Sequence, residues 1–311
     1  MLARAADSLF WLARYMERMD NVARLIEAAQ SMAGVLSETE EWRSALTAAG
    51  VDELYDQAYS LVTPEDAARF LCCGPTNPSS ILNCLQQARI NARAMRTALT
   101  RDMWDAVNQG WLEARVMDDR HFATAMLPET LDWARTLSTR FLGAYETTML
   151  RNEIYWFTRL GTALERADNT ARILDVKYHL LLPSESSGVG GMLDYYQWTS
   201  VLRAVSAVRA YQWVYREEVH PWNVAELLVL RPEMPRSLRA CYDIVTECLD
   251  ELSRIHGGKR GECHRIAGAI SSGLRFGRIA DIFQSGLHEH LTDQIEKAQE
   301  LGDEIANLYM R

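Results

Sequence analysis

The stretch MERMDNVARLIE at residues 16–27 returns 148 residues later as LERADNTARILD at residues 164–175. Most positions that differ exchange one apolar residue for another, and the six identical pairs are Glu17/Glu165, Arg18/Arg166, Asp20/Asp168, Asn21/Asn169, Ala23/Ala171 and Arg24/Arg172. Apolar residues recur around the first copy at spacings of four and three, namely Leu12, Met16, Met19, Ala23 and Ile26. This spacing forms one stripe on a helix, so each copy is predicted to be part of a long helix.

Further landmarks recur in the same order. Trp42 and Leu46 match Trp198 and Leu202, Tyr55 and Tyr59 match Tyr211 and Tyr215, and NPSSILNC at 77–84 matches MPRSLRAC at 234–241. The offset grows from 148 to 157, and a small insertion near 183–191 explains most of that growth. Ordered matches of this kind indicate an internal repeat. We predict a first helical repeat over residues 1–148 and a second over 149–311. The segment 142–150 looks helical and lacks proline, which favours one continuous helical body.

The fold class is predicted to be all-α. Alternating β-branched runs and hairpin turns are nearly absent, whereas helix formers and helical spacing occur throughout the chain. Helix-breaking segments fall between the periodic stretches, at GPTNP (74–78), PSESSGVGG (183–191), RPEMP (231–235) and HGGKRG (256–261). Typical helix lengths then predict a bundle of roughly ten to twelve helices.

Composition narrows the class of protein. The chain has 311 residues, 48% of them apolar and 24% charged, which is ordinary for a soluble globular protein. The net charge of −9 argues against nucleic acid as a partner. No apolar run approaches the ~20 residues that span a bilayer, and the N-terminus does not read as a signal peptide. We therefore expect a cytoplasmic location and no membrane partner, and the oligomeric state is left open.

The six cysteines form no CxxC pair. Reduced, mostly buried thiols are expected in a chain of this size. The neighbours Cys72 and Cys73 are a weak redox signal, and two small residues near a helix end explain them better.

The polar residues of the motif are predicted to share one helix face. With the apolar stripe as reference, Glu17, Asp20, Asn21 and Arg24 cluster roughly 80–180° away, while Arg18 points elsewhere. The two acids are then placed to hold Arg24 within the helix. The second copy does the same with Glu165, Asp168, Asn169 and Arg172, with Arg166 in the place of Arg18.

Three interpretations of this face remain open. It is a solvated face with weak ion pairs, a buried ion-pair network, or a ligand or catalytic site built on such a network. Residue types and order survive in both copies while the apolar neighbours differ, which favours burial and pairing. The arginines compete for the carboxylates and neither copy contains histidine, so no metal is expected.

A second candidate for anion binding is QQARINARAMR at 86–96. Arg89, Arg93 and Arg96 fall on one helix face, a basic stripe suited to phosphate or carboxylate. A surface arginine face, or a partner for the acidic motif residues, explains the same spacing. HGGKRG lacks the spacing of a phosphate-binding P-loop, and no GxSxG or HExxH occurs.

The repeated motif and its neighbours resemble the alpha-E family, bacterial all-helical domains with a Glu-Arg motif. The resemblance rests on segments that together cover most of the chain: MERMDNVARLIE, NPSSI (77–81), ARINARAMR (88–96), RDMWDAVN (101–108), LERADNTARILD, and VAELLVL to MPRSL (224–238). In CCGPTNPSS (72–80), cysteines stand where the family usually has acidic or polar residues.

The resemblance implies no activity for this chain. It implies a partner, because such domains are typically encoded beside, or fused to, a circularly permuted ATP-grasp protein, often with transglutaminase-like and Ntn-hydrolase-like neighbours. That context suggests a system that makes or modifies peptides through ATP-activated amide bonds.

Three functions follow as hypotheses, none of which is expected to need a cofactor. The first is an accessory component, non-catalytic or co-catalytic, beside an ATP-grasp ligase. The second is an enzyme or a binder of a small anionic ligand such as a peptide or acyl phosphate. Its acid–base groups would be Glu17, Asp20, Glu165 and Asp168, and its anion-binding groups Arg24, Arg172, Arg89 and Arg93. The third is a plain helical scaffold.

Overall fold

The computed structural model describes residues 3–32, 38–181 and 192–311. Within these ranges the chain forms fifteen α-helices, one 3-10 helix and no strand, which confirms the all-α prediction. The predicted ten to twelve helices were too few. Helices as short as α3 (Asp52–Ala58) and α14 (Ile279–Ser285) make only about two turns, too little to show a periodic stripe.

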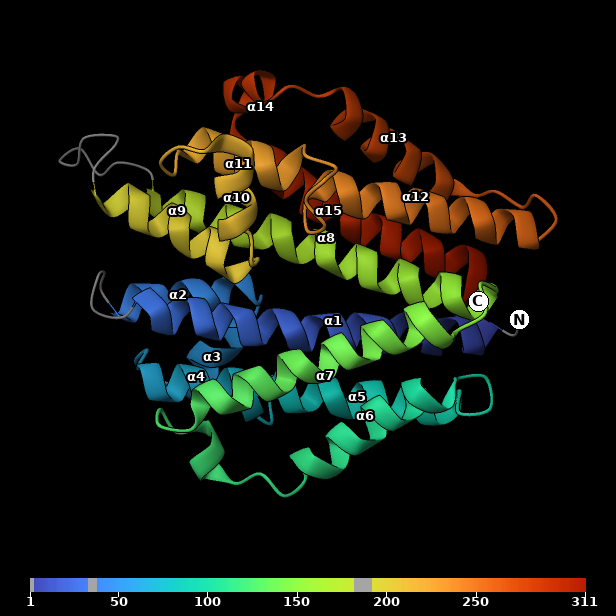
Figure 1. Cartoon of the computed structure of the whole chain (residues 1–311), viewed down its shortest axis with the longest axis horizontal. Coiled ribbons are helices and arrows are strands. Elements are labelled where there is room, and N and C mark those ends of the chain that lie inside the picture. The colour runs from blue at the N-terminus through green and yellow to red at the C-terminus, as the bar shows by residue number, and fades with distance from the viewer. Residues whose placement is uncertain (1–2, 33–37, 182–191) are drawn as a thin grey trace.

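Two long helices run side by side through the middle of the molecule (Figure 1). These are α1 (Ala3–Met32) and α8 (Glu153–Leu181). The helices α5 (Ile81–Ala94) and α7 (Leu127–Thr148) pack on α1, and α12 (Leu238–Ile255) and α15 (Leu287–Tyr309) pack on α8. Both central helices are therefore buried on several sides, so polar residues on them are enclosed by the fold.

Smaller helices complete the structure around the central pair. They are α2 (Glu38–Ala48), α4 (Pro64–Cys73), α6 (Arg101–Ala114), η1 (Asp119–Phe122), α9 (Met192–Ala204), α10 (Val208–Tyr215), α11 (Pro221–Val229) and α13 (Glu262–Phe276). The start of α1 and the end of α15 lie at the same end of the molecule (Figure 1), and the two helices touch. None of the helices in the described ranges has the length and hydrophobicity needed to cross a bilayer.

Local sequence explains where several helices begin. Ser80 and Ser237 each accept the N–H three residues further on, at 3.3 Å before α5 and 3.0 Å before α12. Thr63 does the same at 3.1 Å before α4, where Pro64 fills the first turn. These side-chain oxygens satisfy N–H groups that have no partner inside the helix.

The segments α1–α7 and α8–α15 share several backbone features. Gly50 (φ 68°) and Ser206 (φ 55°) follow the ends of α2 and α9 in the left-handed region. The next residue donates its N–H to the carbonyl five residues back, at 3.0 Å and 2.7 Å respectively, which is a Schellman end. The internal duplication itself, with bounds 1–148 and 149–311, stays a prediction.

The link between the two segments is partly as expected. Residues 142–148 are helical, but α7 ends at Thr148 because Met149 is extended and a turn follows. Asn152 then accepts the N–H of Ile154 at 3.0 Å as α8 begins. The predicted insertion near 183–191 lies outside the described residues.

The central helices approach each other closely at Gly161. A Cβ at this position would lie 2.3 Å from the backbone oxygen of Phe10 and 3.3 Å from the Cβ of Ala13. Ala13 is the residue 148 positions earlier, so both helices carry a small residue where they meet. Only glycine at position 161 fits this approach.

Gly161→Ala is expected to lower the free energy of unfolding by about 1–3 kcal/mol, because the new Cβ meets a backbone oxygen of α1. The control is Gly143→Ala in α7, where a Cβ would meet no atom within 4 Å. That change is expected to be neutral or to stabilise by up to about 1 kcal/mol. Urea unfolding measures both, and equal midpoints for the two variants would contradict the tight approach.

Candidate functional site

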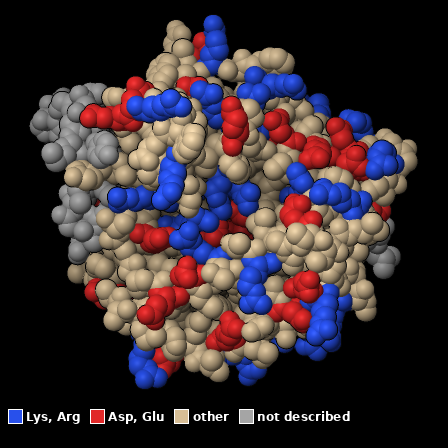
Figure 2. All heavy atoms as spheres, viewed as in Figure 1, with Lys and Arg blue, Asp and Glu red and all other residues tan. Residues whose placement is uncertain are grey.

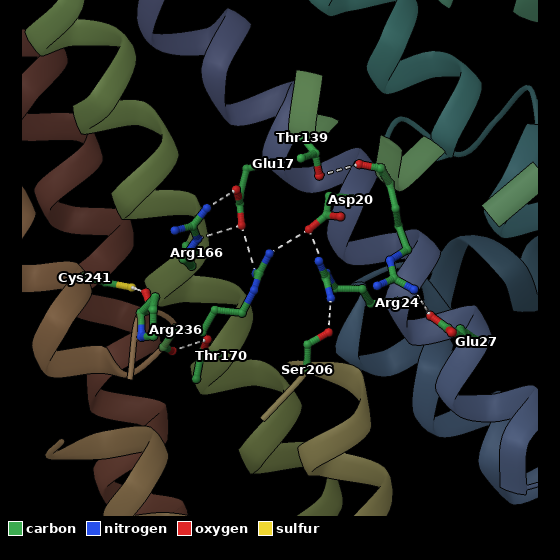
Figure 3. Close-up of polar contacts among 12 residues, drawn as sticks. Glu17, Asp20, Arg24, Glu27, Thr139, Arg166, Thr170, Ser206, Arg236 and Cys241 are labelled. Atoms are coloured by element: carbon green, nitrogen blue, oxygen red, sulfur yellow. Dashed lines mark hydrogen bonds and ion pairs between the residues drawn. The ribbon is translucent and has the colours of Figure 1, made fainter. Parts of the chain in front are cut away.

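The two Glu-Arg dipeptides bind each other across the central helix pair. Arg18 donates to both carboxylate oxygens of Glu165, from Nε at 2.6 Å and from Nη2 at 3.1 Å. Arg166 donates to Glu17 in the same way, at 2.9 Å and 2.8 Å, as Figure 3 shows. The two-pronged geometry is the strong form of this interaction. The helix geometry placed Arg18 off the face that carries Glu17, Asp20 and Arg24, and its guanidinium binds Glu165 of α8 instead of these residues.

Each carboxylate also binds a second arginine. Arg236, just before α12, donates from Nη1 to Glu17 Oε1 at 2.9 Å and from Nη2 to Asp20 Oδ2 at 2.6 Å (Figure 3). Arg14, one turn before Arg18, donates from Nε to Glu165 Oε2 at 2.7 Å. Neither arginine is predicted from the sequence.

A comparison of the two copies could not find these arginines because neither recurs. Ser79 takes the position equivalent to Arg236, and Thr162 takes the position equivalent to Arg14. The sequence offered one indirect signal. A buried carboxylate that binds a single arginine still has unpaired oxygen lone pairs, so a second donor for each glutamate could have been expected.

The aspartates bind arginines of their own helix. Arg24 donates from Nε to Asp20 Oδ2 at 2.7 Å, and Arg172 donates from Nε to Asp168 Oδ2 at 2.9 Å. Glu17 makes no described hydrogen bond to Arg24 and accepts from Arg166 and Arg236 instead, although the charge of Arg24 also helps to lower the pKa of Glu17.

These contacts define two equivalent groups of side chains. The first cluster contains Glu17, Asp20, Arg24, Arg166 and Arg236, and the second cluster contains Glu165, Asp168, Arg172, Arg18 and Arg14. Each contains three arginines and two carboxylates. Arg236 joins the two carboxylates of the first cluster, whereas no ion pair among the described residues joins Glu165 and its arginines to Asp168 and Arg172. The side chains of Glu17 and Glu165 are each 1% exposed, so the solvated-face interpretation was wrong.

Burial and charge act in opposite directions on the two glutamates. Burial is the largest effect and favours the neutral acid, but Arg166 and Arg236 outweigh it and lower the pKa of Glu17 to about 2. Arg18 and Arg14 likewise lower the pKa of Glu165 to about 2. Both glutamates are anionic at neutral pH. A general acid or base needs a pKa near the working pH, so neither fits that role there.

The two motif asparagines, which directly follow Asp20 and Asp168, are buried. Asn21 is 3% and Asn169 is 6% exposed. No hydrogen bond joins either amide to the two clusters in the described part of the chain, and Nδ2 of Asn169 is buried without a partner. The ion pairs therefore do not explain why both copies of the motif have asparagine at this position.

The structure places the predicted arginine stripe against α6 and away from both clusters. Arg89 donates from Nε to Asn108 Oδ1 at 3.1 Å and lies over the ring of Trp111. Arg96 follows the end of α5 and lies over the ring of Trp104, while Arg93 is exposed. None of their described contacts reaches a motif residue, so the structure does not bring together the groups that the second functional hypothesis combines.

The cysteines offer no activated nucleophile. All six are unpaired, and burial raises the pKa of Cys84 and of Cys241, which neighbour the two clusters, to about 12. A thiol must ionise to attack. Among the described residues, no group of three or more histidine, cysteine or acidic side chains is placed to hold a metal ion.

The charged surface is mixed on the face seen in Figure 2. Basic atoms gather at its middle, and acidic atoms lie among them.

The Glu-Arg pairs decide which family the chain belongs to. A family model described as a predicted alpha-helical domain with a conserved ER motif matches residues 1–310. The chain belongs to the Alpha-E family. Two ER dipeptides occur in this Alpha-E chain, and each glutamate binds the arginine of the other dipeptide.

Similar proteins are known from mycobacteria. The uncharacterized proteins Mb2597 of Mycobacterium bovis and Rv2567 of Mycobacterium tuberculosis are 29% and 28% identical to this Alpha-E chain over 117 residues. The alignment covers 32% of this chain and 13% of each relative, so the relatives extend far beyond the shared stretch. No solved structure matches the chain.

Replacing Glu17 by glutamine leaves Arg166 and Arg236 facing a neutral group. We expect the free energy of unfolding to fall by about 3–5 kcal/mol, the usual cost of removing one partner of a buried pair. The control is Glu262→Gln, whose carboxylate pairs with Arg265 on the surface and should leave stability unchanged. Urea unfolding compares the two variants. An unchanged midpoint for Glu17→Gln would show that the reciprocal pairs do not hold the helices together.

Acid should weaken the fold through these glutamates. The pKa of Glu165 is lowered from 4.5 to about 2, so its ionised form stabilises the fold fully above pH 4.5. This contribution is lost as the pH falls toward 2. Glu165→Gln starts less stable, and we expect it to lose less stability than the native chain between about pH 5 and about pH 2.5. Thermal melts across this range measure both slopes, and parallel slopes would assign the acid sensitivity to other groups.

Proposed function

We propose that this Alpha-E chain is an accessory component, non-catalytic or co-catalytic, of a system that forms or modifies peptide or other amide bonds with an ATP-grasp-type ligase. The observation that carries this proposal is the reciprocal binding of the ER residues. Glu17 and Glu165 are buried, ionised and fully engaged with arginines, so they fix α1 against α8. Residues used in this way suit a rigid positioning element better than acid–base chemistry.

The link to an ATP-grasp partner is supported by the family context described above. The mycobacterial relatives also extend well beyond the shared stretch, which agrees with a domain that works joined to others. An ATP-dependent partner implies work in the cytoplasm.

A second candidate is a small-ligand binder. It is favoured by the charges of the two clusters, each of which has three guanidinium groups for two carboxylates and therefore one surplus positive charge. The two candidates are compatible, because an accessory protein can present a ligand to the enzyme beside it.

Purification of the chain from its own host at low salt should recover an ATP-grasp protein in fixed stoichiometry, measured by native mass spectrometry. Adding the chain to that ligase should raise the rate of ATP-dependent amide formation, while the chain alone turns over neither ATP nor amide. The matched control is the folded Gly143→Ala variant, which should behave like the native chain. Amide chemistry by the chain alone would support the enzyme hypothesis, and neither a partner nor an effect on the ligase would leave the plain scaffold.

A further inference from the structure

The two clusters share their ion pairs and differ at two positions beside them. In the first cluster, Asp20 accepts from Arg236, and Arg24 donates from Nη1 to the hydroxyl of Ser206 (Figure 3). The sequence repeat matches Arg236 with Ser79 and Ser206 with Gly50. Ser79 lacks a guanidinium and Gly50 lacks any side chain.

These differences leave two groups of the second cluster with fewer partners. Oδ1 of Asp168 is buried and has no hydrogen-bond partner. Arg172 uses its Nε on Asp168, and its Nη1 lies beside Gly50, where a Cβ would be 3.6 Å away. Serine at that position would present a hydroxyl to Arg172, as Ser206 does to Arg24. The second cluster thus offers one acceptor and one guanidinium edge next to each other.

The second cluster is also the more open of the two. The side chain of Arg172 is 26% exposed against 13% for Arg24, and that of Asp168 is 12% exposed against 5% for Asp20. The same holds for the arginine that grips the glutamate from the other helix, at 24% for Arg18 against 15% for Arg166. A small molecule therefore has better access to the second cluster.

Charge restricts which ligand suits this cluster. Arg14, Arg18 and Arg172 already exceed the two carboxylates by one charge, so a further cation alone is disfavoured. An anion alone would not supply the hydrogen-bond donor that Asp168 lacks. A zwitterion meets both requirements without changing the net charge, provided that its two charged groups are close together. Asp168 and Arg172 are themselves paired, with Nε of Arg172 2.9 Å from Oδ2 of Asp168, so Oδ1 and Nη1 belong to two side chains in direct contact.

We propose that the second cluster binds a free α-amino acid. Its ammonium group donates to Oδ1 of Asp168 and gives this carboxylate a second donor, as Arg236 does for Asp20 at Oδ2. Its carboxylate accepts from Nη1 of Arg172, as the hydroxyl of Ser206 accepts from Arg24. Ammonium and carboxylate sit on one carbon in an α-amino acid, which matches the adjacent groups. This inference deepens the proposed function and rests on it in one respect, that the bound amino acid is a building block for the ligase.

Isothermal titration of the isolated chain with each common L-amino acid tests the proposal without any ligase. At least one amino acid should bind, and its N-acetyl derivative and its amide should each bind about tenfold more weakly or not at all, because each lacks one charged group. No heat from any amino acid would overturn the proposal, as would equal binding of both derivatives.

Variants that copy the first cluster into the second locate the site. Gly50→Ser combined with Ser79→Arg should fold and lose amino-acid binding, since each new side chain takes the place of one ligand group. Ser206 already shows that serine fits this backbone, with φ 55° against 68° at Gly50. Gly50→Ser alone should weaken binding if the double variant does not fold. The control, Ser206→Gly beside the first cluster, should bind as the native chain does.

Binding that survives Gly50→Ser and the double variant would place the amino acid elsewhere and overturn the inference. The partner experiment separates this inference from the proposed function. A native chain that recovers the ligase but binds no amino acid would contradict this inference alone. A native chain that binds an amino acid but recovers no ligase would contradict the accessory role alone.

Discussion

Two carboxylates buried between the central helices constrain the rest of this fold. An ionised carboxylate away from water is costly unless it is paired and hydrogen-bonded. Glu17 and Glu165 each meet this requirement with one arginine from the opposite central helix and one more from nearby. Because both pairs join α1 to α8, a slip of either helix by one residue would leave both glutamates unpaired. The outer helices pack on this pair, so its register also fixes where they lie.

Helical periodicity is enough to predict the all-α class, and repetition is enough to single out the ten motif residues. Arg14 and Arg236 escaped prediction because they occur once and bind glutamates 151 and 219 residues away in the chain. The contact of Arg18 with Glu165 escaped for another reason. A helical wheel relates a residue to the apolar stripe of its own helix, but α1 is packed against α5, α7 and α8, and no single stripe marks its inner side.

The two clusters differ in composition, yet both buried glutamates stay paired. Arg236 and Arg14 come from unrelated places, yet each brings its cluster to three guanidinium groups. They approach different carboxylate oxygens, Oε1 of Glu17 and Oε2 of Glu165. Charge is thereby held constant while the hydrogen bonding at the edge differs. The hydrogen bonds of Asp20 and Asp168 can therefore differ while the ion pairs between α1 and α8 stay the same.

The first helix begins at the end of the molecule where the last helix finishes, as Figure 1 shows for α1 and α15. A domain whose ends are neighbours can interrupt a longer polypeptide and keep the flanking parts close together. The central ion pairs lie away from that junction, so linkers of many lengths would leave them undisturbed. In a longer protein, the segments before and after this helical body would both leave it from the same end. The body would then lie to one side of those segments and would not separate them as a spacer does.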